Sequence, residues 1–418
     1  MRYALVVGSL VALVGVTTPT AGATVTLKAE NRQPKGWAAG GWGSYRFTLR
    51  NDGPEDATIV KWTAHWEANG KQIGDPWGGD INQPLPSGKE VTRDEVGELP
   101  VEVANAAKPG LAAMVGSFTV RQGSSNADLA FRIEVPEAVL PEPLRRIAGK
   151  TVELELMESR FRDFQHLQRT LDWVDQCYSA MMDLTGEKPF GGKRMVFEEA
   201  PPHPWWAYAG EHMILNTDFV GQTLKDFDDG LISFGWIHEV GHNFDVLGRW
   251  YIWNGPSAEW QANFKLCYAF ETIPDQSFRI KWTFQAPGYP APDPNTRLTG
   301  HDLVERFFLM FGDQYMVDPS RTWDTLSSDE MHSFFQRLQR VYGWDVFKRW
   351  YRTYRRLEDA GMTPPEKPEE KVSLIAAILS KETGVDLVPT FQRWRFPVTP
   401  ESVKAMRERY KLDEGRPG

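Results

Sequence analysis

The sequence predicts a multidomain protein, with an N-terminal antiparallel β-sandwich ahead of an α+β domain whose C-terminal part is helical. Three observations support this order. Short alternating apolar segments fill residues 24–139, helical apolar spacing dominates from residue 149 onward, and a proline-rich stretch lies between them. We therefore expect a sandwich at 24–139, a linker at 140–148 and a second domain at 149–410, with its helical part at about 300–410.

The first 23 residues are typical of a secretory signal peptide. Arg2 is followed by an apolar run at 3–16 and by the small-x-small site Ala21-Gly22-Ala23. The apolar run is too short for a membrane span, and no cysteine at the cleavage point would carry a lipid. The sequence thus predicts a protein that is secreted or periplasmic and has no transmembrane span.

The expected sandwich is read from paired alternating segments. Residues 45–50 and 59–67 alternate apolar and polar side chains, and the latter segment is followed by Asn69-Gly70, a strong hairpin-turn pair. A later pair occupies 114–120 and 129–135. Several tryptophans in this region have two possible uses, stacking on sugars or filling the core, and we expect core packing for most of them. They are Trp37, Trp42, Trp62, Trp66 and Trp77.

The main chemical signal is a His-Glu-x-x-His motif formed by His238, Glu239 and His242, within an expected helix at about 229–247. On a helix, residues four apart lie on one face, so both imidazoles can bind the same metal ion. Glu239 lies about 100° further round, where it can reach a metal-bound water without binding the metal. This spacing predicts a zinc site in which Glu239 is the general base and acid.

A second expected helix, starting after the loop at 254–257, supplies the third ligand. Glu259 follows His242 at a distance that allows a turn between two helices. Two histidines and one glutamate leave a fourth zinc position for water, as in catalytic sites. Asn263 lies one helical turn after Glu259, where it can orient a histidine ligand. We therefore expect one Zn²⁺ ion per chain, bound by His238, His242 and Glu259.

The net charge of −9 argues against a nucleic-acid partner. The only cysteines, Cys177 and Cys267, lie in apolar, helix-like segments, so we expect buried free thiols rather than a disulfide.

Just upstream of the metal helix, residues 207–217 predict a strand at the rim of the site. An exposed strand of this kind can pair with an extended substrate backbone. Trp205 and Trp206 precede it, and they either pack beneath the strand or form an aromatic platform for substrate.

Over residues 149–409 the sequence resembles the enhancin-like zinc metallopeptidases, gluzincins that include mucin-degrading enzymes. The resemblance implies a zincin-like catalytic domain and proteins carrying O-glycans as substrates. It also implies Ala209 and Gly210 as rim-strand substrate contacts. One departure is Glu211-His212, where an aromatic residue and a proline are expected. The matching motifs are Trp236-x-His238-Glu239-x-Gly241-His242-Asn243, Glu259-x-x-x-Asn263, Ala209-Gly210, Gly384-x-Asp386-Leu387 and Phe391-x-x-Trp394-x-Phe396-Pro397.

The sequence leaves two points open. The first is function: the prediction is a zinc endopeptidase acting on protein or glycoprotein, and the alternative is an extracellular glycan- or protein-binding module with an idle zinc site. The second is the group that would stabilise an oxyanion. Four side chains qualify by type, namely Tyr251, Tyr268, His301 and Tyr315.

Overall fold

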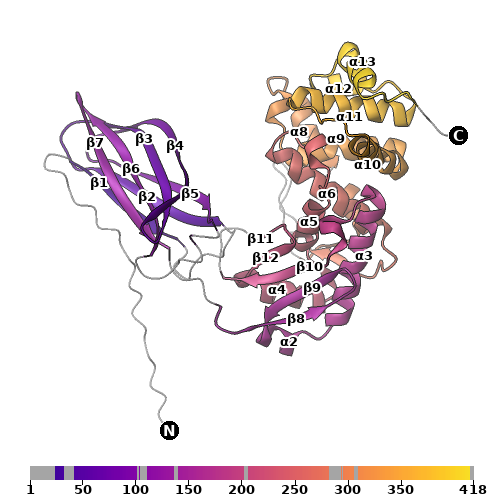
Figure 1. Ribbon diagram of the computed structural model, residues 1–418, viewed down its shortest axis with the longest axis horizontal. Coiled ribbons are helices and arrows are strands. Elements are labelled where there is room, and N and C mark those ends of the chain that lie inside the picture. Colours follow the sequence, from indigo (N-terminus) through magenta and orange to yellow (C-terminus); the bar gives the residue numbers. More distant parts are fainter. Residues whose placement is uncertain are drawn as a thin grey trace, which may run out of the picture. The chain divides into compact units, whose positions relative to one another are not determined.

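The structure of the chain, a computed structural model, describes residues 24–32, 42–100, 103, 111–135, 140–201, 206–281, 293, 295–305 and 309–414. The chain divides into two compact units (Figure 1). One unit comprises residues 1–143 with two short segments at 199–206 and 215–219, and the other comprises the remaining residues. The predicted signal peptide, Trp37 and Trp205 lie outside the described residues.

The first unit contains two antiparallel sheets. One has the order β1-β2-β5, from β1 (Val25–Asn31), β2 (Trp42–Asn51) and β5 (Glu90–Glu98). The other has the order β4-β3-β6-β7, from β3 (Ala57–Ala68), β4 (Lys71–Leu85), β6 (Ala112–Gln122) and β7 (Ser125–Glu134). Buried side chains of both sheets form one core. The expectation of antiparallel β structure in the N-terminal region is confirmed.

Two local predictions hold in this unit. Asn69 and Gly70 join β3 to β4 and both have positive φ, 52° and 75°, as a type I′ hairpin turn requires. Trp62 and Trp66 are buried, and Trp77 packs on Trp66 with ring centroids 5.4 Å apart. Core packing is therefore the use of these three tryptophans.

The second unit is built on a five-stranded sheet of order β11-β12-β10-β9-β8. Its strands are β8 (Leu144–Ala148), β9 (Val152–Met157), β10 (Met195–Ala200), β11 (Ala207–Tyr208) and β12 (His212–Asn216). β9 runs antiparallel to β8 and parallel to β10. Leu154 and Phe197 are paired neighbours on one face, and Phe197 contacts Trp236 of the helical layer at 5.4 Å.

The linker prediction for 140–148 is wrong in its second half, because residues 144–148 form β8. Arg146 faces Glu155 of β9 and donates to it at 2.6 Å, so a charged segment becomes an edge strand. The turn between these strands is held by Asp175, which accepts the backbone N–H groups of Lys150 and Thr151. These contacts are long-range, so the local composition of 144–148 gave no sign of them.

Helices cover the sheet and fill the rest of the second unit, with α5 and α6 between the sheet and the C-terminal helices (Figure 1). The helix expected at 160–184 is split, because Asp228 accepts the backbone N–H groups of Gln165 and His166 between its halves. The helices are α2 (Glu158–Asp163), α3 (Leu167–Thr185), α4 (Thr217–Asp228), α5 (Phe234–Asn243), α6 (Gly255–Thr272), α7 (Gly300–Leu303), α8 (Leu309–Val317), α9 (Ser328–Tyr342), α10 (Trp344–Asp359), α11 (Pro368–Thr383), α12 (Val388–Arg393) and α13 (Pro400–Arg409). A small sheet of order β13-β14-β15 joins β13 (Leu231–Ile232), β14 (Arg279–Lys281) and β15 (Arg297–Leu298).

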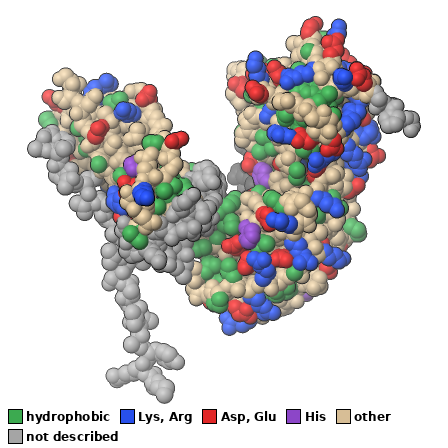
Figure 2. Space-filling model, viewed as in Figure 1, with side chains coloured by type: hydrophobic (Ala, Val, Ile, Leu, Met, Phe, Trp, Pro, Cys, Tyr) green, Lys and Arg blue, Asp and Glu red, His purple; other side chains and the backbone are tan. Residues whose placement is uncertain are grey.

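The helical core is aromatic. Trp260 of α6 stacks on Phe335 of α9 with centroids 4.0 Å apart, and Trp350 of α10 packs beside them. Cys177 and Cys267 are buried free thiols, as predicted. On the face shown in Figure 2, Lys and Arg side chains are interspersed with Asp and Glu. No helix among the described residues is long and apolar enough to cross a membrane.

Candidate metal centre

Helix α5 carries the His-Glu-x-x-His motif and is shorter than the predicted helix at 229–247. It begins after Ser233, whose side chain accepts the N–H of Trp236 at 3.3 Å, and it ends at Asn243. Gly230 has φ of +75°, and β13 follows it, so residues 229–232 are not helical. Trp236, Ile237, Val240 and Gly241 form the buried face, which leaves the two histidines on another side.

Helix α6 begins with a capping box. Asn254 accepts the N–H of Ser257 at 2.8 Å, and Ser257 accepts the N–H of Asn254 at 2.9 Å. This fixes the start of α6 one turn before Glu259. α6 also approaches α5 closely, since a Cβ on Gly241 would lie 2.6 Å from the carbonyl oxygen of Ala262. The caps and this contact set the position of Glu259 relative to α5.

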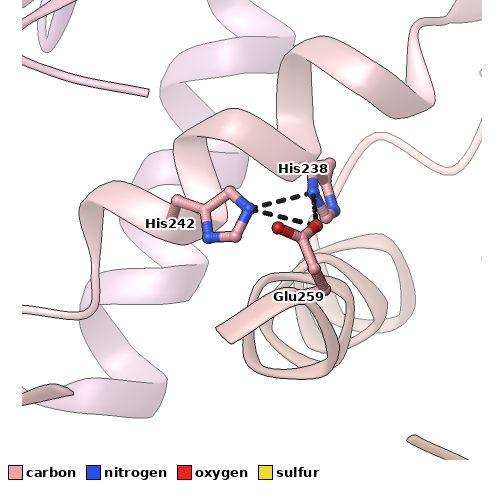
Figure 3. A group of neighbouring side chains, drawn as sticks. All are labelled: His238, His242 and Glu259. Carbon is pink, nitrogen blue, oxygen red and sulfur yellow. Dashed lines mark hydrogen bonds and ion pairs between the residues drawn. The ribbon is translucent and has the colours of Figure 1, made fainter. Parts of the chain in front are cut away.

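The three predicted ligands meet at one point. Figure 3 shows His238 and His242 projecting from one helix toward Glu259 on the next. The two Nε2 atoms are 3.0 Å apart, and Glu259 Oε2 lies 3.0 Å from His238 Nε2 and 3.5 Å from His242 Nε2. The histidines are mostly buried, with side-chain exposures of 14% and 18%, whereas Glu259 is 50% exposed.

This triangle fits a zinc ion. Ligand atoms about 2.0–2.2 Å from a tetrahedral zinc lie roughly 3.3–3.6 Å from one another, close to the three distances observed. Asn263 is buried, and its Oδ1 lies 2.7 Å from His238 Nδ1. Because an amide oxygen only accepts, Nδ1 donates the proton and the Nε2 lone pair of His238 faces His242 and Glu259. The geometry and donor types therefore suit a metal ion with an open fourth position.

The protonation states of these groups follow from their surroundings. Hydrogen bonds from His238 and His242 hold the pKa of Glu259 well below its usual range. Burial lowers the pKa of His238, but the hydrogen bond with Glu259 and the nearby carboxylates raise it overall. Burial raises the pKa of Glu239 despite the two histidines beside it. Glu239 is therefore a better proton acceptor than an exposed carboxylate, which suits a general base.

The rim strand predicted at 207–217 is broken in the structure. Residues 207–208 form β11 and residues 212–216 form β12, with a bend at 209–211 between them. A Cβ on Gly210 would lie 2.9 Å from the carbonyl oxygen of His212, so this bend is tight. Glu239 accepts a backbone hydrogen bond from Ala209. Ala209 and Gly210 thus lie beside the metal site, and Trp206 directly precedes β11 in the chain.

Two residues near the site had no role in the sequence-based prediction. Phe234 stacks on His238 with centroids 6.0 Å apart. Asn243, the last residue of α5, donates from Nδ2 to the Gly210 carbonyl at 2.9 Å and lies 3.1 Å from Met195 Sδ. The spacing of Glu239 and Asn243, one helical turn apart, was the available signal for the second residue.

The tyrosines considered for oxyanion stabilisation have other partners. The hydroxyl of Tyr251 donates to Asp245, that of Tyr268 to Asp183 and that of Tyr315 to the Trp394 carbonyl. His301 is 71% exposed and lies 3.9 Å from Glu271. The printed contacts of these four residues do not include the ligand set.

A second cluster of metal-binding residue types lies on the sheet face opposite Phe197. It comprises Glu155, Glu198 and His212. Arg146 donates to Glu155 at 2.6 Å, and His212 Nδ1 lies 2.5 Å from Glu198. Each carboxylate thus has a cationic partner already, and ion pairing accounts for the cluster.

The sequence of this chain matches the family model of Peptidase M60, enhancin and enhancin-like, over residues 138–395. Among curated proteins, it is 27% identical to the TRPM8 channel-associated factor homolog of Danio rerio over 40% of this chain and 16% of that protein. It is 21% identical to TRPM8 channel-associated factor 1 of Bos taurus over 62% of this chain and 26% of that protein. The chain thus spans at most about a quarter of the length of these two relatives.

Several solved structures are similar. One is a functionally unknown conserved protein from Bacillus anthracis, with a TM-score of 0.48 and 14% identity over 85% of this chain and 71% of that chain. Another is a metallopeptidase from Bacteroides thetaiotaomicron, with a TM-score of 0.46 and 11% identity over 91% of this chain and 66% of that chain. A third is the catalytic module of the metalloprotease ZmpA from Clostridium perfringens, with a TM-score of 0.42 and 14% identity over 92% of this chain and 79% of that chain. Because the family model covers more than half of the sequence, this chain belongs to the Peptidase M60 family of enhancin and enhancin-like proteins.

Proposed function

We propose that this chain is a secreted, zinc-dependent endopeptidase of the gluzincin type, with a zincin-like catalytic domain, that cleaves O-glycosylated, mucin-like proteins. One observation carries the peptidase part. His238, His242 and Glu259 converge with their ligand atoms 3.0–3.5 Å apart, and Glu239 lies next to His238 on the same helix without joining that triangle. Membership of a metallopeptidase family supports the same conclusion.

His238, His242 and Glu259 would hold the ion, and Asn263 would keep His238 in the tautomer that binds it. Zinc bound there supplies Lewis-acid activation of water and of the scissile carbonyl. Glu239 then takes a proton from the attacking water and gives it to the leaving amine. Its burial keeps competing solvent away and raises its basicity.

The rim segment Ala207–Gly210 is the proposed docking element for substrate. β11 is an end strand of its sheet, so its outer backbone edge has no neighbouring strand among those described. An extended peptide can add to such an edge by main-chain hydrogen bonds. The Ala209 contact with Glu239 would bring that peptide close to the base.

The glycan requirement rests on the family resemblance and on exposed aromatic surface. Trp206 is 40% exposed and Phe219 is 46% exposed, and their rings pack edge to face with centroids 6.3 Å apart. Exposed aromatic faces of this kind can stack on sugar rings. The pair lies in residues that immediately precede β11 and follow β12 in the chain.

The test is cleavage of a mucin-type glycoprotein before and after enzymatic removal of its O-glycans. We expect fragments from the glycosylated form and far fewer from the stripped form, with mass spectrometry locating the sugar beside each cut. Equal cleavage of both forms would refute the glycan requirement and leave the peptidase proposal intact. Zinc-loaded protein that binds the glycoprotein but never cleaves it would support the alternative, a binding module with an idle zinc site.

A further inference from the structure

Two side chains of α5, one helical turn apart, hold consecutive residues of the rim. Glu239 accepts the N–H of Ala209, and Asn243 Nδ2 donates to the carbonyl of Gly210 at 2.9 Å. Residues four apart lie on one helix face, so both contacts come from the same side of α5. The rim segment is thereby fixed to the helix that carries two of the proposed metal ligands.

We propose that Asn243 is a positioning residue, which keeps Ala209 and Gly210 in register with Glu239 and so sets where the scissile carbonyl of a bound peptide lies. This inference rests on the proposed function. Asn243 itself touches none of the three ligands in the contacts described, although it directly follows His242. Its effect on catalysis would pass through the rim segment alone.

The rim segment has a specific need for such an anchor. Ala209 and Gly210 lie in the bend between β11 and β12, outside both strands. The Gly210 carbonyl therefore finds its partner in a side chain rather than in a strand. The N–H of Ala209 goes to Glu239 in the same way. Removing the Asn243 donor leaves Gly210 without this hydrogen bond and lets the bend shift relative to α5.

A purely structural role for Asn243 would use its other contact, Met195 Sδ at 3.1 Å. A thioether is a weak acceptor, and Met195 is a fully buried residue of β10 whose place a leucine can take at similar volume. Replacing Met195 therefore removes the sulfur contact and keeps the Gly210 contact. This provides the matched control.

The experiment compares Asn243→Leu, which keeps the volume and removes the donor, with Met195→Leu in the full chain. Both variants are expected to keep one zinc per chain. For a long peptide substrate, kcat/KM should fall about 10- to 100-fold in Asn243→Leu, because small misplacements of a reacting group are costly. Met195→Leu should stay within about twofold. Hydrogen exchange of the 207–212 backbone should be faster only in Asn243→Leu, with or without zinc.

A small zinc-directed probe separates the rim from the metal site. Acetohydroxamate reaches the metal without needing the rim, so its affinity, measured by calorimetry, should change less than about twofold in Asn243→Leu. Gly210→Ala disturbs the same bend from the other side, and it serves if Asn243→Leu does not fold. The double variant should be little worse than the worse single variant, because coupled residues are not additive.

The outcomes are distinct. Wild-type rates and exchange in Asn243→Leu, or loss of zinc or acetohydroxamate affinity in proportion to activity, would overturn the positioning role while wild-type protein still cleaves. Independent, multiplying effects of the two substitutions would also overturn it. A wild-type chain that binds zinc but cleaves no peptide would instead remove the proposed function, and this inference with it.

Discussion

Glu239 is the residue whose substitution should separate metal binding from catalysis. Its carboxylate lies beside the ligand triangle and accepts the Ala209 N–H, so Glu239→Gln should preserve the site while removing the proton acceptor. We expect activity to fall on the order of a thousandfold or more, with zinc content unchanged at one per chain. Metal analysis and peptide cleavage on one sample measure both quantities. Substantial turnover by this variant would exclude Glu239 as the base.

Glu259 and Asn263 share a face of α6 but should differ in their effect on zinc. Glu259 Oε2 points into the triangle, whereas Asn263 contacts only the far nitrogen of His238. Asn263→Ala should weaken zinc binding or activity by about 10- to 100-fold, and Glu259→Ala should lose zinc under mild chelation. Zinc affinities of the two purified variants decide this. An unchanged affinity in Asn263→Ala would reduce that residue to a packing role.

At the scale of elements, the site depends on how closely α5 and α6 approach. A Cβ on Gly241 would lie 2.6 Å from the Ala262 carbonyl oxygen, so Gly241→Ala must push the helices apart. We expect a loss of about 1–3 kcal/mol in the free energy of unfolding, together with weaker zinc binding, because the ligands come from both helices. Gly255→Ala is the control, since a Cβ there meets nothing within 4 Å. Denaturant unfolding and zinc titration of both variants provide the measurements, and equal behaviour would contradict the close-packing argument.

The elements also show which predictions depended on tertiary contacts. Helix α6 begins where its sequence indicates, because Asn254 and Ser257 cap it locally. The edge strand β8 was expected to be a linker, since its pairing with β9 and the support from Asp175 are not local. The rim strand is broken at Gly210 by a tight bend that its alternating pattern did not reveal.

At the scale of the whole molecule, the two units contain separate hydrophobic clusters, and the proposed zinc ligands all belong to the second unit. Zinc should therefore stabilise only that unit. A ligand present at a thousandfold its Kd adds about 4 kcal/mol, so EDTA should lower one calorimetric transition by several degrees and leave the transition of the sandwich unchanged. The same scan with Glu259→Ala should show no EDTA effect. A shift of both transitions together would show that the units unfold as one.

The sequence by itself determined the chemistry of the site, because the spacing of His238, Glu239 and His242 on a helix is a local property. It also determined the antiparallel β character of the first unit and the burial of both cysteines, through alternation and helical periodicity. Only the tertiary structure decided that Glu259 meets the histidines and that Asn263 reaches His238 Nδ1. It alone placed Asn243 against Gly210. The reason is physical: these contacts depend on how α5 packs against α6 and the rim, and no local periodicity encodes that packing.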